Sequence, residues 1–134
     1  MMGPGGRFHS ADDLDIELRV LLSGWQVADT ADLAVVHRGF RTFAEGKEHA
    51  IRDWLGIGAC LGKLAKARHP AAIALAVWEF TAHAVAPPLV DALHLRKPRG
   101  WQRIVSFCRG FANGLAAPVD GRTMRFTDER DTSP

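Results

Sequence analysis

The sequence predicts a mostly helical chain with a small α/β portion at its start. Three observations support this fold class. The 134 residues are about one domain's worth, and a composition of 47% hydrophobic and 24% charged residues is typical of a soluble globular protein. Two short runs with strand character lie before residue 42. From residue 42 onward, apolar residues recur at helical spacing.

Charge and cysteine content narrow the class of protein. A formal charge of +2, from 17 Lys and Arg against 15 Asp and Glu, argues against a nucleic-acid partner, which favours a strongly basic face. Cys60 and Cys108 lie far apart without metal-ligand spacing; they fit a reducing compartment, and one disulfide stays open as an alternative. The N-terminus lacks the apolar stretch of a signal peptide. We therefore expect a cytoplasmic protein, with peripheral contact to the cytoplasmic face of a membrane as a further expectation.

The first predicted helix follows a glycine-rich loop. Ser10 is a plausible N-cap with Asp13 three residues later, and the helix should run to about Ser23 and stop at Gly24. One helical stripe is formed by Leu14, Leu18, Leu21, Leu22 and Trp25.

Two short strands are predicted next, at Trp25–Ala28 and Leu33–His37, with residues 29–32 as the turn between them. Two strands alone are only marginally stable. This portion therefore resembles the end of a larger α/β domain, followed by a helical appendix.

The remaining elements are predicted to be helices. Thr42 and Glu45 form a capping signature, and Gly58 and Gly62 leave room for another backbone to approach the same helix closely. Its apolar stripe consists of Ile51, Trp54, Leu55, Gly58, Leu61, Gly62 and Ala65. A last helix should run from about Arg99 to Leu115, before a polar tail.

An apolar segment over residues 70–90 is long enough to span a bilayer. Glu79 and His83 lie within it, which favours a buried or interfacial helix over a spanning one. Pro87 and Pro88 should break or kink it. The predicted organisation is an α/β part over residues 1–41, a helical extension over 42–117 and a flexible tail over 118–134.

The pattern that points to chemistry lies before residue 42. An acidic cluster, Asp12-Asp13-Leu14-Asp15, opens the first helix. A Gly24-Trp25 turn leads into the first strand, and the second strand ends in Val35-Val36-His37. Taken one at a time, the acidic residues are ordinary helix-start charges and His37 an ordinary structural histidine.

In order, type and approximate spacing, these residues resemble the C-terminal half of a family 2 glycosyltransferase, an inverting enzyme of GT-A fold. The resemblance covers about Gly3 to Arg41, and residues 42–54 more loosely. It implies that Asp13 is the catalytic base, that Asp12 is its acidic neighbour, and that His37 helps bind a divalent metal, Mn or Mg. The loop containing Gly5 and Gly6 corresponds to the border of the acceptor site.

These roles agree with the chemistry of glycosyl transfer. Inversion needs an ionised carboxylate within hydrogen-bond reach of the attacking hydroxyl. The leaving nucleoside diphosphate needs a metal or cationic side chains, and Arg38 and Arg41 are candidates for diphosphate or substrate contact. Solvated side chains are the plainer interpretation of both arginines.

The resemblance implies a nucleotide-sugar donor and a glycan or lipid-linked acceptor, as in the synthesis of a bacterial-type surface polysaccharide. The nucleotide-binding half does not occur in the 134 residues, since the one Asp-x-Asp sequence, Asp13-Leu14-Asp15, belongs to the acidic cluster. We expect a fragment that carries the acceptor half and is inactive alone. The alternative is a non-catalytic helical module that binds a membrane surface or a protein partner. The basic cluster around Trp101, which consists of Arg96, Lys97, Arg99 and Arg103, would suit anionic lipid or be a solvated face.

Overall fold

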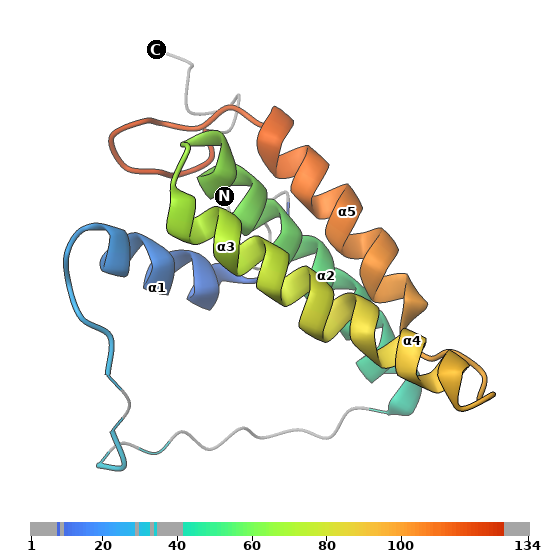
Figure 1. Cartoon of the computed structure of the whole chain (residues 1–134). Helices are drawn as coiled ribbons and strands as arrows, with labels where there is room; N and C mark the ends of the chain where they lie inside the picture. The colour runs from blue at the N-terminus through green and yellow to red at the C-terminus, as the bar shows by residue number, and fades with distance from the viewer. Residues whose placement is uncertain (1–7, 9, 29, 33, 35–41, 128–134) are drawn as a thin grey trace.

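The computed structural model describes residues 8, 10–28, 30–32, 34 and 42–127. In chain order, its helices are α1 (Asp12–Leu22), α2 (Phe43–Lys66), α3 (Pro70–Trp78), the π-helix η1 (Glu79–Val85), α4 (Ala86–Leu93) and α5 (Trp101–Ala116). Figure 1 shows α2 and α5 side by side, the α3–η1–α4 segment running along them, and α1 lying across one end. The prediction of a mostly helical chain is confirmed.

The strand predictions are not confirmed. Within the described residues the β-structure consists of one isolated bridge, between Val119 and Phe126. Residues 25–28 are exposed and irregular, and of residues 33–37 only Ala34 is described. A strand needs a partner for its backbone groups, and no described segment lies beside residues 25–28 to supply one.

The start of α1 differs from the prediction. Ala11, in the left-handed region at φ 64°, precedes the helix, and no side chain caps it. The Ser10 hydroxyl instead donates to the Asp53 carboxylate of α2 at 2.5 Å. The predicted stop at Gly24 agrees with its φ of +85°.

The start of α2 has the predicted capping box. The Glu45 amide donates to the Thr42 hydroxyl at 3.3 Å, and the Thr42 amide donates to the Glu45 carboxylate at 2.7 Å. These two bonds satisfy amides that the first turn of a helix leaves without partners.

Glycines allow α2 and α5 to pack backbone to backbone. A Cβ on Gly58 would lie 2.3 Å from the Phe107 carbonyl oxygen, and one on Gly110 would lie 2.0 Å from that of Leu55. Gly62 and Gly114 lie one turn further along their helices, and a Cβ on either would likewise collide with the backbone of the other helix. The two helices therefore run parallel, and each glycine pair is spaced by four residues, which places both members on one face.

Pro87 and Pro88, predicted to break or kink the helix, do not break the α3–η1–α4 segment. Both prolines lie in the first turn of α4, where a missing amide hydrogen is tolerated, and the π-helix η1 precedes them. The Thr81 hydroxyl donates to the Val77 and Trp78 carbonyl oxygens, at 2.7 and 3.3 Å. The chain therefore stays helical from Pro70 to Leu93.

Residues 118–127, predicted to be part of a flexible tail, fold back onto the helices. Phe126 is buried and its ring centroid lies 4.7 Å from that of Phe8. The two aromatic rings close the core cluster beneath α1, because each provides the other with an apolar neighbour.

Cys60 and Cys108 are free thiols, which settles the alternative of a disulfide between them.

Candidate functional site

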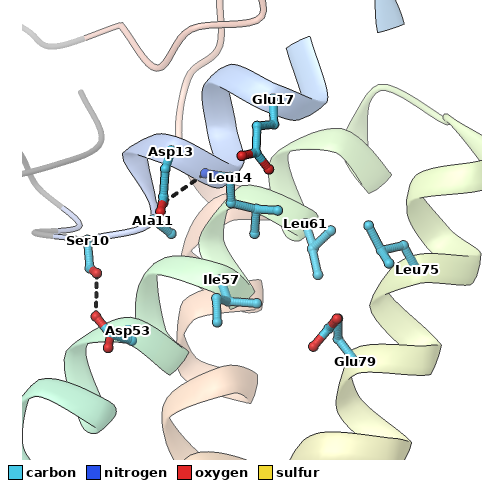
Figure 2. A pocket seen from close by; sticks show the side chains of 10 residues that line it. All are labelled: Ser10, Ala11, Asp13, Leu14, Glu17, Asp53, Ile57, Leu61, Leu75 and Glu79. Carbon is cyan, nitrogen blue, oxygen red and sulfur yellow. Dashed lines mark hydrogen bonds between the residues drawn. The ribbon is translucent and has the colours of Figure 1, made fainter. Parts of the chain in front are cut away.

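The candidate site is a pocket of about 500 Å³ between α1, α2 and the end of α3. Figure 2 shows apolar side chains at its centre and carboxylates around them. The apolar residues are Leu14, Ile57, Leu61 and Leu75, and the carboxylates belong to Asp13, Glu17, Asp53 and Glu79. No basic side chain is among the lining residues.

Local packing explains why the pocket forms. A Cβ on Gly56 would lie 2.6 Å from the Ser10 carbonyl oxygen, so the glycine lets the turn before α1 rest directly on α2. The hydrogen bond from Ser10 to Asp53 holds this turn in place (Figure 2). The first turn of α1 is thereby fixed above Ile57, and Asp13 is brought to the pocket.

The two predicted catalytic residues behave differently. Asp12 and Asp13 are both exposed, but only Asp13 lines the pocket. One oxygen of Asp13 accepts the Leu14 amide at 2.8 Å, which leaves its second oxygen for another donor. A carboxylate that is exposed, oriented by one backbone bond and located at the positive end of a helix can accept a proton from a bound hydroxyl.

Other predicted site residues lie outside the described residues. They are Gly5, Gly6, His37, Arg38 and Arg41. The expected convergence of Asp13 and His37 therefore stays a prediction. Within the described part of the chain, no three His, Cys, Asp or Glu side chains come together in a way that could hold a metal ion.

A buried charged cluster, which was not predicted from the sequence, joins α1 to α2. Lys63 of α2 is fully buried, and its ammonium group donates to the buried Asp15 carboxylate. Arg19 donates to the other Asp15 oxygen at 3.1 Å. The Lys63 ammonium also lies 5.0 Å from the centroid of the Phe126 ring. Every charge in this cluster is paired, as buried charges must be.

The Cys60 thiol belongs to the same cluster, with its sulfur 3.7 Å from the Asp15 carboxylate. Burial raises the pKa of this thiol to about 12, and the negative charge of Asp15 adds to the effect. A thiol with such a pKa is inert as a nucleophile at neutral pH. The cluster therefore positions α1 and does not contribute a reactive group.

A signal for this cluster is present in the sequence. Asp15 follows the buried Ala11 by four residues, and Lys63 follows the buried Ala59 by four, so each charge lies on the apolar side of its helix. Opposite charges on two apolar stripes indicate a buried pair, although the pattern does not say which helix meets which.

A second pocket, of about 790 Å³, is lined by basic side chains where the first is lined by acidic ones. It opens between the first turns of α2 and the loop that leads into α5, and its lining contains Lys47, Lys97, Arg99 and Arg103 but no carboxylate. Arg99 is held by Asp91, with two side-chain bonds of 3.1 Å, and this pairing keeps the pKa of Asp91 below its usual range.

Comparison of the chain with models of protein families, with curated proteins and with solved structures finds no match.

Proposed function

We propose that this chain is the acceptor-side part of an inverting glycosyltransferase of family 2 type, which transfers a sugar from a nucleotide-diphosphate donor to a glycan or lipid-linked acceptor. The observation that supports it most is the contrast between Asp13 and Asp15. Asp15 is buried and anchors α1, whereas Asp13, half a turn away, is exposed at the edge of a pocket. The helix is held rigidly while one carboxylate stays available.

The composition of the pocket suits an acceptor sugar. Carboxylates accept hydrogen bonds from hydroxyl groups, and apolar side chains pack against the carbon skeleton of a sugar ring. Since the pocket lining carries four carboxylates and no cation, it does not suit a diphosphate. The acidic pocket is thus proposed for the acceptor, with the donor bound elsewhere.

In this proposal Asp13 takes the proton of the acceptor hydroxyl as its oxygen attacks the donor sugar. Asp12, next to it and exposed, adds negative charge without lining the pocket. The nucleotide-binding part would come from outside these 134 residues. A divalent metal would be held there, with His37 as the contribution of this chain, and would stabilise the leaving diphosphate.

The test is glycosyl transfer by the chain joined to the coding sequence upstream of it, measured as release of nucleoside diphosphate from a panel of nucleotide sugars with Mn. Asp13→Asn keeps the shape of the side chain and removes the base. We expect a loss of about 10²- to 10⁴-fold in kcat, the usual contribution of a general base.

Two matched variants complete this experiment. Glu48→Gln removes an exposed carboxylate on α2 that pairs with Arg52 at 3.7 Å, away from the pocket, and should leave turnover unchanged. Asp12→Asn should lower it less than Asp13→Asn. Equal rates for Asp13→Asn and the parent would refute the assignment of Asp13 as the base.

The alternative, a non-catalytic helical module, has its own supporting observation. The α3–η1–α4 segment carries large apolar side chains that are mostly exposed, among them Val77, Trp78 and Leu93. If the joined chain shows no transfer with any donor and Asp13→Asn changes nothing measurable, the module is the better account.

A further inference from the structure

The most conspicuous unpartnered surface is the outer side of the α3–η1–α4 segment, which we call the apolar face. It is formed by Ile73, Val77, Trp78, Leu89, Val90 and Leu93, whose exposed fractions range from 46% to 73%. Of the most apolar 18-residue window in the segment, only 17% is buried. Exposed large apolar side chains that gather on one side of a helix mark interaction surfaces in proteins.

The inner side of the same segment packs against the other helices. Ala72, Ala76, Ala84 and Pro88 are buried, and they are spaced by multiples of four residues. Ile73, Val77 and Leu89 each follow one of these buried residues by a single position. The segment therefore has one side against the helices behind it and one side of apolar residues facing outward.

The apolar face continues into an amphipathic end of the molecule. Figure 1 shows the end of α4 beside the starts of α2 and α5. Leu95, Phe43 and Trp101 are exposed here by 96%, 94% and 57%. Phe43 and Trp101 also line the second pocket.

Positive charge surrounds these side chains. Lys47 and Lys97 line the second pocket and Arg96 lies next to it; all three are exposed, and none forms an ion pair with a described carboxylate. We call these three residues the basic rim. Exposed cations around aromatic and aliphatic side chains complement a surface with negative headgroups above an apolar interior.

We propose that the apolar face and the basic rim dock the protein on an anionic lipid bilayer, with the α3–η1–α4 segment lying in the plane of the interface. The aliphatic side chains and Trp78 would enter the acyl boundary, while the basic rim would pair with headgroup phosphates. This inference goes beyond glycosyl transfer and does not depend on it.

An in-plane position is favoured over a spanning one by what packs behind the segment. Glu79 faces the acidic pocket on the inner side, and α2 carries Glu48 and Arg52 exposed to solvent. A spanning segment would draw these charges toward the hydrocarbon region, at high cost for each.

The experiment is flotation of the 134-residue chain with vesicles of phosphatidylcholine alone or with 30% phosphatidylglycerol. We expect binding to the anionic vesicles that weakens with salt. The double variant Lys47→Gln/Lys97→Gln should bind about 30-fold more weakly, because each cation near an anionic surface strengthens binding roughly fivefold. The matched control Arg109→Gln/Arg125→Gln removes two exposed cations outside the rim and should bind like the parent.

A second measurement tests the apolar face without relying on charge. Brominated lipids should quench tryptophan fluorescence in the bound protein. Trp78→Leu and Trp101→Leu should each lose part of the quenching, while the buried Trp54 adds little. Equal binding to both kinds of vesicle, or equal losses in the rim and control variants, would overturn the proposal. So would a stable dimer by ultracentrifugation that binds no vesicle, since a second copy would then cover the face.

Discussion

Asp13 and Asp15 show how much the position of a single residue decides. They are two residues apart in one acidic cluster, yet Asp13 is exposed and Asp15 is buried against Lys63. A helix turns about 100° per residue, so two positions carry a side chain to the opposite side. The position of Asp15 also affects the pKa of the Cys60 thiol, because this buried thiol lies beside the Asp15 carboxylate.

The Cys60 thiol should make stability fall in alkali. Its pKa is about 9.0 when unperturbed and about 12 in the folded chain, so above pH 9 only the unfolded chain releases the proton. Deprotonation therefore favours unfolding, by about 1.4 kcal/mol for each pH unit between these values. Urea titrations at pH 8 and pH 10 should show a decline larger by about 1.4 kcal/mol in the parent than in Cys60→Ala. The exposed Cys108→Ala should decline like the parent; equal declines in all three would contradict the prediction.

At the scale of the elements, the packing of α2 on α5 depends on glycine. Gly58 and Gly62 on one helix, and Gly110 and Gly114 on the other, meet carbonyl oxygens at distances that exclude a Cβ. Glycine lowers the intrinsic helix propensity of both elements. The cost is offset because the two backbones approach closely and bury the side chains between them.

The effect of a Gly→Ala substitution on the free energy of unfolding should therefore depend on its position. Gly58→Ala and Gly62→Ala should each lower the free energy of unfolding by about 1–3 kcal/mol, since the new methyl group forces the helices apart. Gly46→Ala on the same helix meets nothing within 4 Å and should raise it by about 0.5–1 kcal/mol through helix propensity. Chemical denaturation measures all three, and stabilisation by Gly58→Ala would show that the helices are further apart than described.

For the molecule as a whole, the main question is how α1 is attached to the other helices. Three long-range contacts hold it: the buried pair of Asp15 and Lys63, the hydrogen bond from Ser10 to Asp53, and the core cluster that Phe8 and Phe126 close. The first two join α1 to α2 across more than 40 positions of sequence. Because α1 carries Asp13, the same contacts determine where the candidate base lies.

Removing one partner of the buried pair should be costly. Lys63→Met leaves the Asp15 carboxylate buried with only Arg19 beside it, and we expect a loss of about 3–5 kcal/mol. The double variant Asp15→Leu/Lys63→Met should recover most of this stability, since no buried charge is left unpaired. Arg52→Gln breaks an exposed pair and should cost less than about 1 kcal/mol. A loss of the same small size in Lys63→Met would mean that the pair is open to solvent.

Much of the helical architecture was predictable from the sequence, because its causes are local. The capping box at Thr42, the stop at Gly24 and the glycine face at Gly58 and Gly62 depend on residues within a turn or two of each other. The acidic cluster at the start of α1 could also be named as a candidate site. Within this cluster the family resemblance singled out Asp13, but helix periodicity alone did not show that Asp15 would be buried, since this depends on the side of α1 that meets α2.

Local signals in the sequence were enough to predict that most of the chain is helical, that α2 starts at a capping box and which faces of the helices are apolar, because hydrogen bonds and side-chain periodicity act over a few residues. Long-range packing, in contrast, brings Asp15 to Lys63 and Phe126 to Phe8, and it leaves residues 25–28 without a strand partner. These outcomes depend on which segments come together. Burial and charge pairing gain their energy only after distant parts of the chain have met.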